Sequence, residues 1–332
     1  MPGGLSVSVV IPAWNEEASI GPLLDSLLCQ TCRPDEILVV DAGSSDNTAK
    51  IVQSYRLWSP RIRLLSIGRA HPGVARNAGT RSARHDFIAF TDCGMRLDAG
   101  WLQALRTPME RAPATEVVYG SYEPVTDTLF RQCAAVVYVS PKTQRGHQWL
   151  RGPVVASCLL RRSVWRAVGE FPPYRAAEDL IFIERIAQHG CTVAYAPDAV
   201  THWELSADLA SLVRKYTTYS FHNLVAGRGR YWHAGVARAY VAGLPFLWLG
   251  LRQSHAWFLV LAVGGAARVA RAFHRQRRES WSAPGRDPRR WLMVGLTMLA
   301  LDAATGAGWL WWIWRTVRGG FRPPSHLEIA SL

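Results

Sequence analysis

Short apolar runs alternate with amphipathic helices through the first part of the chain. Residues 7–11 (VSVVI) and 37–40 (ILVV) are almost continuously apolar, which is typical of strands that are buried on both faces of a sheet. The segment between them has apolar residues at the spacing of one helix face, at Ile20, Leu23, Leu24, Leu27 and Leu28. Because this strand–helix pattern repeats as far as residues 86–90 (DFIAF), we predict an α/β fold with a mainly parallel sheet.

Polar side chains follow three of these predicted strands. Asn15 and Glu16 come after the first strand, Asp41 ends the second, and Asp92 follows the strand at residues 86–90. In open α/β sheets, ligands bind beyond the carboxyl ends of the strands, so these residues predict a binding site. Taken singly, each acid also fits the N-cap of a following helix, and we favour that interpretation for Asp46.

The composition excludes a disordered chain, and the positive charge is concentrated in the C-terminal part. The 332 residues are 49% hydrophobic and 11% aromatic, and the net charge is +13. Residues 201–332 hold 17 Lys and Arg against 6 Asp and Glu, and they also hold 10 of the 15 Trp. Such a mixture is typical of a membrane headgroup layer, and nucleic acid is the competing partner. The six cysteines form no disulfide framework, which favours reduced, cytoplasmic surroundings.

Five ordered motifs resemble the inverting glycosyltransferases of family 2, over about residues 5–205. They are VSVVIPAWNEEASI, ILVVDAGSSDNT, GVARNAG, FIAFTDCG and AAEDLIFIERI. The resemblance implies the GT-A nucleotide-diphospho-sugar transferase fold, with a Rossmann-like sheet. It also implies a nucleotide pocket lined by Pro12, Trp14 and Glu16, with Asp41 accepting a hydrogen bond from the base and Arg76 near the base and diphosphate.

The same resemblance implies roles for the remaining acids. Asp179 corresponds to the catalytic base, with Glu178 as its supporting neighbour, although acids also suit the first turn of a helix. Asp92 resembles the first acid of the family's D-x-D motif, which binds Mg²⁺ or Mn²⁺. Gly94 stands where the second acid is expected, so we name His202 as a second candidate metal ligand.

The C-terminal part predicts a hydrophobic helical appendage. We expect a catalytic domain at residues 1–235 and a membrane-associated region at residues 236–332, in which segments 240–267 and 291–314 are long enough to span a bilayer. Residues 252–255 (RQSH) interrupt the first segment and Asp302 interrupts the second, and charges are costly at the bilayer centre. We therefore predict two helical hairpins that turn at RQSH and near residues 302–308. Hairpins packed without any lipid are the alternative.

The arginines predict which side of the membrane these hairpins face. Eight arginines lie in residues 268–290, and Arg315, Arg318 and Arg322 follow the second segment. The positive-inside rule places both clusters at the cytoplasmic face of the cell membrane. We expect a nucleotide-sugar donor and a lipid-linked or polysaccharide acceptor there, and no nucleic acid. A nucleotidyltransferase of related fold and a non-catalytic basic module that binds membrane or nucleic acid are the alternatives. The nucleotidyltransferase is disfavoured because no glycine-rich, Lys-bearing phosphate loop follows the first strand.

Overall fold

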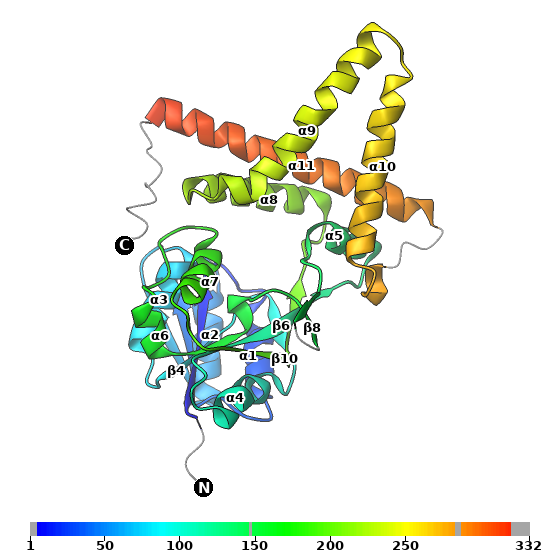
Figure 1. Ribbon diagram of the computed structural model, residues 1–332. Coiled ribbons are helices and arrows are strands. Elements are labelled where there is room, and N and C mark those ends of the chain that lie inside the picture. The colour runs from blue at the N-terminus through cyan, green and yellow to red at the C-terminus, as the bar shows by residue number, and fades with distance from the viewer. Residues whose placement is uncertain (1–4, 146–147, 283–286, 320–332) are drawn as a thin grey trace. The chain divides into compact units, whose positions relative to one another are not determined.

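The computed structural model describes residues 5–145, 148–282 and 287–319 (Figure 1). Contacts between Cα atoms divide the chain into two compact units. Within the described residues, we call 5–124 and 143–204 the sheet unit, and 125–142 and 205–319 the helical unit. The domain boundary predicted after residue 235 stays a prediction. All six cysteines are free.

The sheet unit is built around a sheet with eight described strands, in the order β3-β2-β1-β4-β9-β6-β10-β5. The first four strands in this order are mutually parallel: β1 (Val7–Ala13), β2 (Glu36–Asp41), β3 (Ile62–Ser66) and β4 (Phe87–Phe90). β9 (Cys158–Arg161) is antiparallel to β4 and to β6 (Val117–Val125), and β10 (Val193–Glu204) is antiparallel to β5 (Met95–Leu97). The predicted α/β fold is confirmed.

Helices cover both faces of this sheet. They are α1 (Ile20–Leu28), α2 (Thr48–Trp58), α3 (Pro72–Ser82), α4 (Trp101–Arg111), α6 (Arg162–Ala167) and α7 (Glu178–Gln188). The 3₁₀ turn η1 (Val155–Ser157) precedes β9, and β7 (Thr143–Arg145) pairs with β8 (Gln148–Leu150). Along β1, Val9 and Ile11 join a buried cluster with residues of α1 and α4, whereas Val10 joins a second cluster with residues of α3 and α7. Burial on both faces explains why β1 is continuously apolar.

The helical unit contains the basic, tryptophan-rich part of the chain. Its described elements are α5 (Leu129–Tyr138), α8 (Leu209–Val225), α9 (Gly229–Arg252), α10 (Trp257–Arg275), η2 (Ser280–Ser282) and α11 (Pro288–Gly319). α9 and the Pro288–Arg318 part of α11 are long and apolar enough to cross a membrane, by length and composition alone. Arg286 and Arg322, which the topology prediction uses, lie outside the described residues.

The turn predicted at RQSH is present. α9 ends at Arg252 and α10 begins at Trp257, and the two helices pack together as a hairpin (Figure 1). Large apolar side chains are exposed along both arms of this hairpin: Val241, Leu244, Leu247, Trp248, Leu251, Trp257, Leu259, Val260 and Val263. We call residues 241–263 the apolar hairpin.

The turn predicted near residues 302–308 is wrong, because α11 continues through it as one helix. Asp302 does not need a break in the helix, since its carboxylate is buried and accepts hydrogen bonds from Arg268 of α10 and Tyr240 of α9. Gly308 is a packing residue, because a Cβ there would lie 2.5 Å from Ser220 Cβ of α8. Asp302 and Gly308 therefore join helices within the unit.

Candidate active site

Helix α3 is fitted closely against the segment that leads into α7. A Cβ on Gly73 would lie 2.7 Å from the carbonyl oxygen of Pro172 and 3.1 Å from Glu178 Cγ, so only glycine allows this approach. One turn later, the buried Asn77 side chain donates to the carbonyl oxygen of Phe171 at 2.8 Å and accepts from the Phe171 amide at 2.9 Å. The GVARNAG motif thus fixes the backbone that positions Glu178.

Arg76 joins two of the predicted site acids. Its Nη2 donates to Asp92 Oδ1 at 2.6 Å, and its Nη1 donates to Glu178 Oε1 at 2.9 Å. The side chain of Arg76 is only 4% exposed, that of Glu178 8% and that of Asp92 30%. Burial alone would lower the pKa of Arg76, but Asp92 and Glu178 raise it, so the guanidinium stays charged. The carboxyl end of β4 and the first turn of α7 therefore meet at one buried cation.

The first turn of α7 brings Glu178 and Asp179 into this cluster. Ala177, directly before them, has a left-handed backbone (φ 71°), which is unfavourable for a residue with a Cβ. Burial, and then the neighbouring Asp179 carboxylate, raises the pKa of Glu178 to about 7, although Arg76 opposes this. Burial also raises the pKa of Asp179, against the effect of Arg76. Asp179 is less buried than Glu178, so it is the acid with better access to a ligand.

The backbone after Asp92 explains the glycine in the TDCG motif. The amide of Met95 donates to the carbonyl oxygen of Asp92 at 3.3 Å, and Gly94 adopts φ 79° within this turn. A Cβ at Gly94 would meet nothing within 4 Å, so conformation and not packing favours glycine here. The space beside Gly94 is open.

The ends of β1, β2 and β4 lie together, as the sequence predicts. Pro12 pairs with Val40 of β2, and its carbonyl oxygen accepts from the Cys93 thiol at 3.6 Å. Burial, followed by the carboxylates of Glu16 and Asp92, raises the pKa of Cys93 well above its usual value. Glu16 and Asp92 therefore both lie near this thiol.

Asp41 and Trp14 lie at the ends of β2 and β1. Asp41 is buried and accepts from the Ser44 amide at 3.2 Å. The Trp14 ring has the guanidinium of Arg69 5.4 Å from its centroid and that of Arg175 at 5.3 Å. His71 is close to both arginines. Burial, and then the positive charges of Arg175 and Arg69, lower the pKa of His71. A basic group thus surrounds an aromatic ring, which is a suitable surface for an anionic, aromatic ligand.

Sequence reasoning did not single out Arg69, His71 and Arg175. Arg69 and His71 lie in the short connection between β3 and α3 (residues 67–71, IGRAH), and Arg175 lies in the loop before α7. Basic residues in a loop beyond the carboxyl end of a strand were the available signal. Their gathering around Trp14 depends on contacts more than 50 residues apart in the chain, which the sequence does not reveal.

His202, the predicted second metal ligand, lies against Asp98 of the residues that the structure describes. Its Nε2 lies 2.7 Å from Asp98 Oδ1, and its residue pairs with Arg96 of β5. Among the described residues, no group of three or more His, Cys, Asp or Glu side chains is arranged to hold a metal ion. Mg²⁺ is commonly bound by one or two carboxylates together with ligand phosphates. Asp92 fits such an ion if the ligand supplies further oxygens.

Comparisons with known proteins find glycosyltransferases. Residues 8–168 match the profile of glycosyl transferase family 2. The putative glycosyltransferase EpsH of Bacillus subtilis is 27% identical over 237 residues, which are 67% of this chain and 66% of EpsH. The dolichyl-phosphate beta-glucosyltransferase ALG5C of Trichomonas vaginalis is 37% identical over 100 residues, 27% of this chain and 30% of ALG5C. The alignments with EpsJ of Bacillus subtilis and YibD of Escherichia coli span only 35% and 25% of those relatives.

One solved structure shows the same fold over nearly the whole chain. The mannosyltransferase PcManGT of Pyrobaculum calidifontis, in complex with GDP-Man and Mn²⁺, has a TM-score of 0.61 and 18% sequence identity. The similarity covers 92% of this chain and 88% of PcManGT. At this identity, the likeness establishes the GT-A fold and leaves the substrates open.

Proposed function

Residues 8–168 form a domain of glycosyl transferase family 2, and from this premise we propose that the chain transfers a sugar from a nucleotide-sugar donor to an acceptor hydroxyl, with inversion at the anomeric carbon. The observation that carries the proposal is the cluster of Asp92, Arg76, Glu178 and Asp179 beyond the carboxyl end of β4. It combines an acid suited to the diphosphate side with an acid suited to proton transfer.

Asp179 is the proposed general base. The acceptor oxygen attacks the anomeric carbon as the bond from that carbon to the diphosphate breaks, and the acceptor proton passes to the Asp179 carboxylate. Glu178 acts through position, because its ion pair with Arg76 and its place in the first turn of α7 fix the backbone that carries Asp179. A single displacement of this kind inverts the anomeric centre.

The donor nucleotide is assigned to the ends of β1 and β2. Asp41 is the proposed acceptor for the base, and Pro12, Trp14 and Glu16 line the same pocket. Arg69 and Arg175 beside Trp14 add positive charge for the diphosphate. Arg76 is held between two carboxylates, so its contribution is to orient Asp92 and Glu178, and any direct contact with the diphosphate requires it to shift.

We further propose that Asp92 holds Mg²⁺ or Mn²⁺ together with the donor. The bound ion would neutralise the leaving diphosphate. Mn²⁺ in the PcManGT complex supports this assignment. His202 remains a proposed second ligand, and it would have to release Asp98 first.

The proposed acceptor is lipid-linked or part of the cell envelope, and the proposed location is the cytoplasmic face of the membrane. The exposed apolar hairpin and the basic residues that follow it support membrane association. ALG5C, whose name specifies a dolichyl-phosphate acceptor, supports a lipid-linked one.

A donor panel tests this proposal. The purified full chain is incubated with UDP-, GDP- and dTDP-sugars, and the released nucleotide is measured with and without excess EDTA. We expect release from one donor class and its loss in EDTA. Release that survives EDTA removes the metal from the proposal, and no release from any donor, with lipid extract present as acceptor, contradicts the transferase activity.

A further inference from the structure

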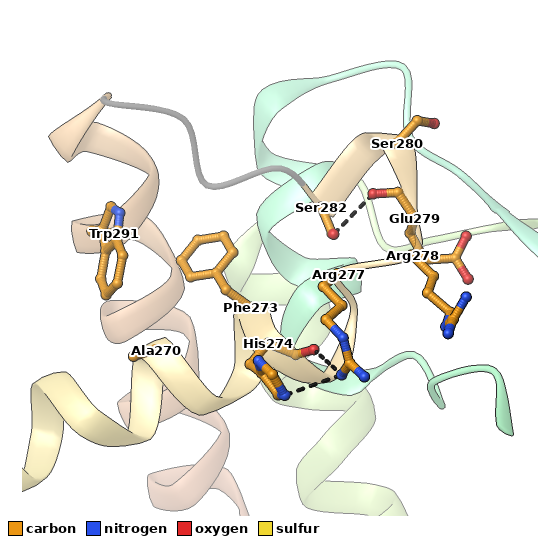
Figure 2. Close-up of a pocket in the computed structure, with 9 residues that line it drawn as sticks. All are labelled: Ala270, Phe273, His274, Arg277, Arg278, Glu279, Ser280, Ser282 and Trp291. Carbon is orange, nitrogen blue, oxygen red and sulfur yellow. Dashed lines mark hydrogen bonds between the residues drawn. The ribbon is translucent and has the colours of Figure 1, made fainter.

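A cavity of about 550 Å³ opens within the helical unit, where the end of α10, η2 and the beginning of α11 meet (Figure 2). It lies far along the chain from the residues assigned to sugar transfer. Its lining comes from the part of the sequence in which arginine and tryptophan are mixed. The chemistry of this lining has two distinct halves.

One half of the lining is apolar and aromatic. Phe273 of α10 is buried, and its ring centroid lies 5.2 Å from that of Trp291 in α11. Trp291 is 37% exposed, so one part of the indole packs against Phe273 and another faces outward. Ala270, one turn before Phe273, leaves room beside them. Such a wall suits a short stretch of hydrocarbon, and partly exposed Trp is typical of a membrane interface.

The other half of the lining is cationic. Arg277 Nη1 donates to the carbonyl oxygen of His274 at 3.1 Å and lies 3.1 Å from His274 Nε2, and Arg278 stands beside it (Figure 2). The acidic residue in the lining is Glu279, and its Oε2 lies 3.6 Å from Lys142 Nζ, which offsets that charge. The lining therefore keeps a positive balance, and guanidinium groups match phosphate oxygens well.

The position of the cavity at the end of α10 indicates that its ligand is a lipid. The apolar hairpin exposes large hydrophobic side chains as far as Val263, and the arginines of α10 begin at Arg268. α10 continues for about 18 Å beyond Val263 to its end at Arg275, and Arg277 lies in the turn that follows. If lipid covers the apolar hairpin, the same helix carries the cavity out of the hydrocarbon and toward the headgroup phosphates.

We infer that this cavity binds one anionic lipid, with the lipid phosphate at Arg277 and Arg278 and the first carbons of its chain against Phe273 and Trp291. The inference rests on the proposed membrane association and is independent of sugar transfer. A lipid held there would anchor the junction between α10 and α11, which the apolar hairpin alone does not reach.

Binding of a short-chain lipid to the purified full chain tests the inference. Dihexanoyl phosphatidylglycerol, kept below its micelle concentration, is titrated calorimetrically, and inorganic phosphate is titrated in parallel. We expect saturable binding of one lipid, at least about tenfold tighter than that of phosphate, because phosphate lacks the chain that contacts the aromatic wall. Equal affinity for phosphate would overturn the assignment to a lipid, and an absence of saturable binding would overturn the site.

Two matched double variants distinguish a discrete lipid site from a general attraction of anionic lipid to the basic surface. The double variant Arg277→Gln, Arg278→Gln removes two charges from the lining. The double variant Arg271→Gln, Arg275→Gln removes two exposed charges from the last part of α10, which do not line the cavity. We expect at least about a tenfold loss in the first variant and less than about a twofold change in the second. An equal loss in both contradicts a discrete site.

Two further measurements keep the outcome distinct from other failures. A thermal unfolding temperature equal to that of the wild-type chain shows that each double variant is folded. The variant Phe273→Leu shortens the apolar wall without altering charge, and we expect it to weaken lipid binding. Flotation of the wild-type chain with phosphatidylcholine vesicles tests membrane association separately. Nucleotide release from the donor is unaffected by the cavity variants, so loss of lipid binding and loss of transferase activity are distinguishable.

Discussion

The protonation of Glu178 and Asp179 governs the proposed chemistry at the scale of single residues. Glu178 is buried, Asp179 beside it is half-buried, and Arg76 supplies one positive charge to the pair. Because the pKa of Glu178 is raised to about 7, a proton remains on this pair at mildly acidic pH. A base that still carries its proton cannot accept one from the acceptor hydroxyl.

We therefore predict that the turnover rate rises with pH through about 7. Below that value it falls by about tenfold per pH unit, as expected for one essential proton. In Glu178→Gln, which removes the neighbouring charge, this limb moves to lower pH. Turnover measured from pH 5 to 9 at saturating donor and acceptor checks the prediction. A rate that is independent of pH below 7 would exclude Glu178 and Asp179 as the titrating groups.

The same pKa has a consequence for stability. The folded pKa of Glu178 is raised above its ordinary value of 4.5, so the folded state keeps a proton that the unfolded state loses. The contribution of Glu178 to the free energy of unfolding is therefore largest below about pH 4.5 and declines as the pH rises toward 7.

At the scale of elements, the close packing of α3 depends on Gly73. We predict that Gly73→Ala lowers the free energy of unfolding by about 1–3 kcal/mol, because the added Cβ meets backbone that cannot rotate away. It also lowers turnover, since Glu178 lies in the same contact. Gly21→Ala in α1 is the control, because its Cβ would make ordinary contact with Tyr55 Oη at 3.5 Å. Chemical denaturation measures the free energy of unfolding of both variants, and equal values for Gly73→Ala and Gly21→Ala would contradict the packing argument.

The sequence predicted the elements better than their contacts, and the reason is physical. Burial of β1 on both faces leaves a local signature in VSVVI, and one helix face leaves another in α1. Arg76 meets Glu178 across 102 residues, and Asp302 meets Arg268 across 34, and neither pairing has a local signature. The incorrect prediction of a turn in α11 has its cause in the second pairing. Without its partner Arg268, Asp302 reads in the sequence as a charge that interrupts an apolar helix.

At the scale of the molecule, a sheet unit with the candidate site is joined to a helical unit with an exposed apolar hairpin. Burying an exposed Leu side chain contributes about 1.5–3 kcal/mol. Covering the hairpin with lipid would therefore provide a substantial affinity for membranes. The sequence predicted this hairpin, because RQSH separates two apolar arms, and it did not predict that α9 begins well before residue 240.

We predict that Leu244→Asp together with Leu259→Asp reduces binding to phosphatidylcholine vesicles by about 100-fold or more, since each change removes an apolar contact and adds a charge. Leu57→Asp, at an 86% exposed leucine of α2, is the control and leaves vesicle binding unchanged. Flotation measures both. Membrane binding that survives the hairpin changes would assign the membrane contact to another part of the chain.

The assignment of Asp179 as the base of a sugar transferase is tested most directly by measuring donor affinity and transfer rate side by side in Asp179→Asn. Glu184→Gln, an acid further along α7, serves as the control. We predict that Asp179→Asn binds the donor with nearly wild-type affinity and transfers sugar about 10² to 10⁴ times more slowly, because the nucleotide pocket is intact and only the proton acceptor is lost. Wild-type turnover in Asp179→Asn, with donor and acceptor both saturating, would contradict the account.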